Sequence, residues 1–494
     1  MRFLFPRRFS LLAISQFRFL AFALVCFAGA LQAETGDDNP TGVSGIFNGN
    51  VTTGGSYDPF TGNAMRVVDD IVVPGTLGTY PLKWTRYWNS RGPDRYHPGG
   101  WRYSYISYAF DADRAFYTFP DGRVISFDEG EAPGIEERCD STGITLADGG
   151  RVIFQATPAP PPGWGTYQLV SQIIDPYGNI TDIEYGDPNK IYRATKIKEP
   201  KAAGAQSDVG RRYLQITYNA SDEVTRVEAY DGVSSTPTQS VDYIWADFPL
   251  DSPANQTDTL NHVSYSDGTS ADYQYRQIAY APSAITQPPT DPWHAPALFT
   301  CDDTRFAGPM RQISYQYDGH PRMVSENHAI RDSGGNLIAG EVVSSITGAG
   351  QQTSTPVETR GDGATRTFTY GGPGSGGKLS QVTDFLGHPT NIGYGSDPNY
   401  PGEGGFITSV TDPNGHKTSY ERHNTPSSWG ITKITHEVDG STILQSFTDP
   451  ANPYYLASRT DELNHKTDYT RDLVWPDPKS WTGYKCSSAG WLIG

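Results

Sequence analysis

The sequence has few cysteines, few charged residues for its length and, past its first thirty residues, no long hydrophobic run. Its 494 residues include four cysteines, and only Cys139, Cys301 and Cys486 would remain after removal of an export signal. Because these three are scattered and lack the spacing of metal ligands, they indicate neither a disulfide framework nor a zinc site. Stability must therefore come from packing, for which a chain of this length can bury a large core.

The one long apolar stretch lies at the N-terminus, where Phe19 to Leu31 follows a series of arginines that begins at Arg2. A positive start, an apolar stretch of this length and small residues up to Ala33 are typical of an export signal, and the stretch is short for a membrane span. We therefore predict a signal peptide over residues 1–33 and no stable membrane span after its removal. The expected location is the periplasm, the cell surface or the medium, and an uncleaved N-terminal anchor is the alternative.

Positive charge is also scarce. The chain has 38 Lys and Arg against 55 Asp and Glu, which gives a formal net charge of −17. Such a surface repels the phosphates of nucleic acids and of anionic lipids. We therefore expect no nucleic-acid partner.

Long helical patterns are nearly absent, and short alternating runs take their place. Residues 102–108 (RYSYISY), 213–218 (YLQITY) and 366–370 (RTFTY) alternate with period two and are rich in Tyr, Ile and Thr. Such runs are strand signals, and the Asp-Gly and Asp-Pro pairs between them are turn signals. The sequence predicts an all-β fold.

The main pattern is a repeat. An Asp is followed three residues later by Gly or Asn, then after three more by Thr, with an aromatic residue eight or ten positions past the Asp. Residues 173–185, 382–394, 410–422 and 459–471 carry it, and Asp267–Gly268 marks a weaker copy. The repeated residues are Asp175, Gly178 and Thr181; Asp384, Gly387 and Thr390; Asp412, Gly415 and Thr418; and Asp461, Asn464 and Thr467.

This spacing is what a tight hairpin requires. A carboxylate at the start of the turn accepts hydrogen bonds from backbone N–H groups two or three residues on, and Gly or Asn adopts the positive φ that other residues resist. In the strand that follows, Thr181, Ile183 and Tyr185 face one side, while Asp182 and Glu184 face the other. Each unit therefore has one aromatic face, which it can bury only together with its neighbours.

These segments resemble the YD repeats of bacterial Rhs proteins, which also occur in insecticidal toxin-complex subunits and in animal teneurins. Upstream, residues 58–63 (DPFTGN), 69–75 (DDIVVPG) and 81–91 (PLKWTRYWNSR) are similar to the segment that opens many Rhs shells. Four copies of the repeat, placed after that segment, extend the resemblance over most of the chain.

The resemblance implies a large β-sheet of successive hairpins that curls into a spiral shell, with a polar interior that holds a C-terminal toxin segment. We therefore predict an Rhs-type N-terminal β domain over residues 34–165 and a YD-repeat sheet over residues 166–494. No Asp-Pro-x-Gly motif, which ends the family's core, stands after the last repeat at residues 459–471, and we expect no toxin domain there. The sheet is accordingly predicted to be C-terminally incomplete.

No carboxylates or histidines stand out as catalytic. The conspicuous aspartates all occupy the same turn position, which indicates turn formers, and the pairs Asp69–Asp70 and Asp302–Asp303 are expected in solvated loops. His388, His416 and His465 follow the turn Gly or Asn and are expected to be exposed positions, not metal ligands.

No metalloprotease or nucleophile-elbow motif occurs either. The glycine-rich loop over residues 371–377 has the spacing of a phosphate loop, but no helix follows it. We therefore predict no enzymatic activity, no cofactor and no metal.

The predicted function is that of a secreted, non-catalytic shell or scaffold. It would enclose or present a partner or toxin polypeptide in bacterial competition or cell-surface interaction, and further Rhs repeats are another candidate partner. The alternative is a secreted module that binds carbohydrate or cell wall, with Trp84, Trp88 and Trp101 stacking on sugar rings. Against this alternative, the same tryptophans are expected to fill the core of the N-terminal domain.

Overall fold

The described part of the chain consists of β-strands, turns and loops. The structure is a computed structural model, and it describes residues 57, 62–90, 101–106, 108–111, 115–120, 124–126, 138–140, 143–146, 149–155, 166–187, 190, 192–202, 207–248, 257–280, 293–305, 312–317, 323–331, 337–348, 355–371, 379–396, 404–422, 431–446 and 457–468. Within these ranges there is no α-helix, so the fold class is all-β, as predicted.

Some sequence predictions fall elsewhere in the chain. The signal peptide over residues 1–33, most of the glycine-rich loop over residues 371–377 and the chain after residue 468 lie outside the described residues. In the described ranges, no helical segment has the length and hydropathy that are needed to cross a bilayer.

Three strands form a small antiparallel sheet near the N-terminus. They are β1 (Met65–Val72), β2 (Lys83–Asn89) and β3 (Trp101–Tyr103), in the order β1-β2-β3. The register of β1 against β2 shifts between Asp69 and Ile71. Such a bulge bends a strand and redirects the side chains that follow it.

All other strands belong to one large sheet. From β7 onward each strand pairs antiparallel with the next along the chain, and β4, β5 and β6 form a branch that joins β10. In the described part of the chain no ladder joins β31 to β4 or β6 to β7, so the sheet is open. The strands are β4 (Tyr108–Asp111), β5 (Ala115–Thr118), β6 (Val124–Ser126), β7 (Arg138–Asp140), β8 (Gly143–Thr145), β9 (Arg151–Gln155), β10 (Thr166–Ile174), β11 (Ile180–Glu184), β12 (Lys196–Lys201), β13 (Tyr213–Tyr218), β14 (Val224–Tyr230), β15 (Gln239–Phe248), β16 (Thr257–Tyr265), β17 (Ser270–Tyr280), β18 (Trp293–Asp303), β19 (Gln312–Tyr317), β20 (Met323–Arg331), β21 (Leu337–Thr347), β22 (Val357–Arg360), β23 (Thr365–Tyr370), β24 (Leu379–Thr383), β25 (Pro389–Ser396), β26 (Gly404–Thr411), β27 (Lys417–Arg422), β28 (Ile431–His436), β29 (Ser441–Ser446), β30 (Ser458–Thr460) and β31 (Lys466–Asp468).

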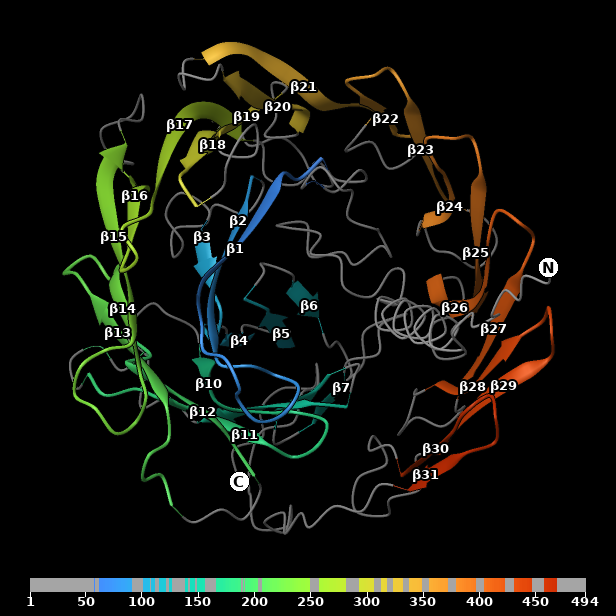
Figure 1. Cartoon of the computed structure of the whole chain (residues 1–494), viewed down its shortest axis with the longest axis horizontal. Helices are drawn as coiled ribbons and strands as arrows, with labels where there is room; N and C mark the ends of the chain where they lie inside the picture. The colour runs from blue at the N-terminus through green and yellow to red at the C-terminus, as the bar shows by residue number, and fades with distance from the viewer. Residues whose placement is uncertain are drawn as a thin grey trace, which may run out of the picture.

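The large sheet curves around an interior. In Figure 1 it runs from the green strands near β10 through β20 to the red strand β31, and the blue strands β1 to β3 lie inside the curve. The predicted sheet of successive hairpins that curls into a shell is therefore confirmed. The sequence placed a domain boundary near residue 165, whereas strands β4 to β9, which precede that point, are already part of the large sheet.

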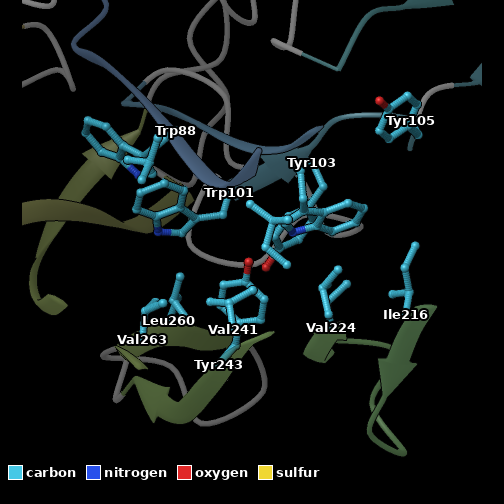
Figure 2. Packing of buried hydrophobic residues seen from close by; sticks show 14 of the residues in the cluster. Trp88, Trp101, Tyr103, Tyr105, Ile216, Val224, Val241, Tyr243, Leu260 and Val263 are labelled. Atoms are coloured by element: carbon cyan, nitrogen blue, oxygen red, sulfur yellow. The ribbon is translucent and has the colours of Figure 1, made fainter. Parts of the chain in front are cut away.

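The core lies between the two sheets. On β13, Leu214 and Ile216 are buried, and the same face of β15 and β16 carries Val241 and Val263, which are 0% exposed. Figure 2 shows Ile216, Val241 and Val263 on the side of the large sheet that faces the aromatic residues of the small sheet. Period-two alternation explains why one face of each of these strands contributes to this core.

One expectation from the resemblance is wrong in this structure. The inner face was expected to be polar, but along β10 to β20 it is apolar and aromatic and it is covered by the small sheet. The polar side chains lie on the opposite face, where Arg226 pairs with Glu228 and Asp242. A sheet that encloses another sheet buries its apolar face inward, as any two packed sheets do.

Replacing Gly415 with Ala should destabilise the β26–β27 hairpin by about 1 kcal/mol, because this residue has a φ of +84°. The space around an added Cβ is open, so the cost is one of backbone conformation and not of a clash. Gly415→Asn is the control and should cost clearly less, since Asn464 adopts a φ of +65° at the equivalent position. Hydrogen exchange of the hairpin amides measures both, and equal losses would contradict this explanation.

Candidate functional site

The four predicted turns share one geometry. The backbone N–H of the Gly or Asn donates to the carbonyl of the turn Asp at 2.9–3.0 Å, and φ at that residue is positive in all four. Each carboxylate accepts from the N–H groups two and four residues on, so the predicted range of two or three residues needs correction. The pairs are Asp175 with Tyr177 and Asn179 (2.9 and 2.8 Å), Asp384 with Leu386 and His388 (both 2.8 Å), Asp412 with Asn414 and His416 (2.9 and 2.8 Å) and Asp461 with Leu463 and His465 (2.9 and 2.8 Å).

The repeated threonines lie in the strand that leaves each turn. Three of them face a β-branched residue across the ladder, a pairing that stabilises antiparallel sheets. The partners are Ile173 for Thr181, Val382 for Thr390, Val410 for Thr418 and Arg459 for Thr467.

One further turn has this geometry but does not match the predicted Asp and Gly pattern. Between β13 and β14, Asn219 takes the place of the turn Asp and accepts from the N–H groups of Ser221 and Glu223, both at 3.0 Å. Asp222 stands where Gly is usual, with a φ of 72°. The signal was present in the sequence, since Asn and Asp both tolerate positive φ, but it required a pattern wider than Asp followed by Gly.

The repeated aromatic residue makes a hydrogen bond that the spacing did not reveal. At the open end of a hairpin, just beyond its paired residues, the hydroxyl of a tyrosine on the second-strand side donates to a backbone carbonyl on the first-strand side. In one hairpin Trp245 replaces the tyrosine and donates to Val224 at 2.8 Å. The tyrosine pairs are Tyr185 with Val170 (2.9 Å), Tyr218 with Ala194 (2.8 Å), Tyr275 with Leu260 (2.9 Å), Tyr317 with Leu298 (2.8 Å) and Tyr394 with Leu379 (2.7 Å). In these hairpins the hydrogen bond holds the two strands together at the open end, as the turn does at the closed end.

A buried ion pair anchors the small sheet to the large one. Arg86 on β2 donates to the carboxylate of Asp70 on β1, and both side chains are fully buried. Tyr243 and Tyr265 of the large sheet donate to the same carboxylate at 2.6 and 2.7 Å, and Arg86 donates to Tyr273 at 3.1 Å. Burial alone would lower the pKa of Arg86, but the Asp70 carboxylate outweighs it and raises the pKa well above its usual value.

Aromatic rings enclose this pair. The guanidinium carbon of Arg86 lies 4.6 Å from the ring centroid of Trp101, 5.5 Å from that of Tyr243 and 5.4 Å from that of Tyr273. Cation–π contacts of this kind are strongest where water is excluded. The charged pair of the small sheet is therefore held in an aromatic pocket made partly by the large sheet.

A second buried carboxylate lies beside the first. Asp303, at the end of β18, accepts from Arg305 at 2.7 Å and lies 3.5 Å from Arg66 of β1. Burial would raise the pKa of Asp303, yet the Arg305 guanidinium holds it below its usual value. Asp303 thus links β1 to the large sheet by charge.

These residues correct the sequence prediction for the two acidic pairs. Asp70 and Asp303 were expected in solvated loops, but both carboxylates are buried and ion-paired. Their neighbours Asp69 and Asp302 are the more exposed members, and Asp69 pairs with Lys83 at 3.2 Å. Tyr243 and Tyr265, which donate to Asp70, lie 173 and 195 residues further along the chain, so no local sequence pattern predicts that Asp70 is buried.

The three tryptophans proposed for sugar stacking lie in the core. Trp84, Trp88 and Trp101 are at most 1% exposed, and their rings lie 5.1–5.9 Å from those of Tyr103, Tyr315 and Tyr273. Trp101 also donates to Tyr275 at 2.7 Å. Their ring faces are therefore occupied by protein and are not open to a glycan.

The turn histidines are exposed. The side chains of His388, His416 and His465 are 57–74% exposed, and each Nδ1 lies 3.1–3.5 Å from the carboxylate of its own turn Asp. Within the described ranges, no group of three or more His, Cys, Asp or Glu side chains is arranged to hold a metal.

Comparison with known proteins gives one family match and several structural similarities. A family described as a domain of unknown function (DUF6531) matches residues 55–127, which include the small sheet, and no curated protein matches. Among solved structures, TcdB2-TccC3 is 10% identical with a TM-score of 0.31, over 78% of this chain and 20% of that one. The Photorhabdus luminescens Tc holotoxin pore is 11% identical with a TM-score of 0.31, over 78% and 19%.

A third similar structure is the N-terminal domain of the effector protein SpvB from Salmonella typhimurium. It is 11% identical with a TM-score of 0.17, over 54% of this chain and 100% of that one. The chain spans about a fifth of the length of the toxin chains that it matches. Similarity at these levels does not establish a shared activity or partner.

Arg86→Ala should reduce the free energy of unfolding by about 3–5 kcal/mol, because it leaves the Asp70 carboxylate buried without its counter-ion. Lys83→Ala is the matched control on the same strand. It removes an exposed ion pair with Asp69 and should cost less than about 1 kcal/mol. Urea unfolding followed by tryptophan fluorescence compares the two, and similar losses would show that the buried pair does not hold the sheets together.

Acid should weaken the late hairpins through their turn carboxylates. Hydrogen bonds from the backbone N–H of His388 and His465 lower the pKa of Asp384 and Asp461, and at Asp412 the bond from His416 does so against partial desolvation. Because each pKa is depressed by folding, this stabilisation is present above about pH 4 and is lost as the pH falls below it.

The matched variant replaces Asp384, Asp412 and Asp461 together with Asn, which already serves in the turn at Asn219. We expect hydrogen-exchange protection of β24 to β31 to fall below about pH 4 in the wild type and to change much less in the variant. The same acid response in both proteins would place its origin outside the turns.

Proposed function

We propose that this chain forms part of the wall of an Rhs-type shell, which encloses or presents a partner polypeptide at or beyond the cell envelope. The observation that supports this most directly is the inward curve of a long sheet whose inner apolar face is only partly covered by the chain's own small sheet (Figure 1).

The two halves of the inner face differ in exposure. Where the small sheet lies, Val241, Val263 and Leu298 are 0% exposed. Further along the chain, Val382 and Tyr420 remain partly exposed, and the buried cluster shrinks to a few residues around Phe368. A concave apolar face of this kind is suited to contacts with another polypeptide.

The proposed role is non-catalytic. The buried carboxylates of Asp70 and Asp303 are engaged by arginine and tyrosine donors, and the repeated aspartates are engaged by backbone N–H groups. A general acid, base or nucleophile must be able to reach a substrate. Because the indole faces of Trp84, Trp88 and Trp101 are covered, the geometry does not favour the carbohydrate-binding alternative.

Protease protection tests the proposal. The protein is produced in its host from the full gene, collected after export and digested with a nonspecific protease. We expect the polypeptide associated with the shell to resist digestion in the wild type and in the Lys83→Ala control, and to become sensitive in Arg86→Ala, which loosens the wall. Digestion at the same rate in all three proteins would contradict a shell.

A further inference from the structure

Two aspartates lie directly opposite each other where β15 ends and β16 begins. Asp247 of β15 and Asp258 of β16 are partners in the antiparallel register. Like charges in this arrangement destabilise a sheet. The ladder therefore carries an unfavourable contact whenever both carboxylates are ionised.

A third carboxyl group, that of Glu223, packs against the same place. Glu223 precedes β14 and is only 5% exposed, and Trp245 of β15 donates to the carbonyl of the adjacent Val224 at 2.8 Å. The side-chain amide of Asn219 donates to Glu223 Oε2 at 2.6 Å. Its Oε1 is buried, and among the described residues no donor reaches it.

The groups that face Glu223 do not neutralise it. Asp258 and Asp247 approach from the neighbouring hairpin, and Tyr103 on β3 interacts with it electrostatically. The cations recorded near this turn, Arg193 and Lys190, pair with Asp222. A desolvated carboxylate without a counter-ion is costly, and binding a proton relieves that cost.

We propose that Glu223, Asp258 and Asp247 form a proton-operated latch at the rim of the wall. In acid, a proton held between Glu223 and Asp258 turns a repulsive contact into an O–H···O hydrogen bond. It also leaves one charge fewer opposite Asp247, so the ends of β14, β15 and β16 are held together. In neutral or basic medium the proton leaves to water and these ends loosen. This latch concerns the wall itself and does not depend on what the wall encloses.

The expected direction of the pH dependence follows from the environment of Glu223. Burial first, and then the neighbouring Asp258 and Asp247, raise the pKa of Glu223 to about 7, while the bond from Asn219 opposes them. Because this pKa is raised by folding, the latch stabilises the wall fully below about pH 4 and ceases to do so as the pH rises through 7. The turn aspartates act in the opposite sense and only in stronger acid, so the two effects occupy different pH windows.

Glu223→Gln tests the latch in the full chain, because an uncharged amide takes the place of the protonated acid. In the wild type, we expect the backbone amides of residues 219–224 and 258–260 to lose about tenfold in hydrogen-exchange protection between about pH 5.5 and pH 8, after correction for the intrinsic rate. The variant should keep its protection over this range. Glu421→Gln, at an exposed position paired with Lys433, is the control and should behave as the wild type.

Three results would overturn the proposal. One is a pH dependence at these amides that survives in Glu223→Gln. Another is recovery of protection at pH 8 when calcium chloride alone is added to the wild type, which would identify a cation site. If Glu223→Gln does not fold, carboxyl signals of the wild type, labelled with carbon-13 at glutamate, decide the question. A glutamate titrating near pH 7 supports the latch, and the absence of such a signal contradicts it.

Discussion

Burial of one apolar face is the constraint on which the rest of this structure depends. A sheet of hairpins carries its aromatic and aliphatic side chains on one side, and that side must be covered by something other than the sheet itself. Here the small sheet β1 to β3 lies inside the curve and covers the stretch from β10 to β20. Its position is set by charge, because Arg86 and Asp70 can be buried only where the tyrosines of β15, β16 and β17 complete their hydrogen bonds.

The hairpins keep their register by two contacts at opposite ends. At the closed end, a turn Asp or Asn binds backbone N–H groups two and four residues on. At the open end, a tyrosine or tryptophan donates to a carbonyl of the partner strand. A slip of one residue would break both contacts and turn the apolar face outward, so the pair specifies the register strongly.

Charge is distributed according to burial. The outer face carries ion pairs such as Arg226 with Asp242, and in the interior Asp70 and Asp303 are matched by arginine. Glu223 differs from them because its neighbours are acidic, and its protonation therefore responds to pH near neutrality. The stability of the wall is thus nonuniform, with a pH-sensitive contact where β15 ends and β16 begins.

The sequence by itself determined the local units. These are the all-β class and the four turns, each with a Gly or Asn at positive φ such as Gly178. They also include the alternation that puts Ile183 and Tyr185 on the buried face. These follow from backbone conformation and from hydrogen bonds within five residues. The tertiary structure decided that Asp70 is buried and that Trp101 is covered. It also decided that the inner face is apolar along the small sheet. The partners of Asp70 lie 173 and 195 residues away, so its burial depends on how the sheet curves and is not encoded in any neighbouring residue.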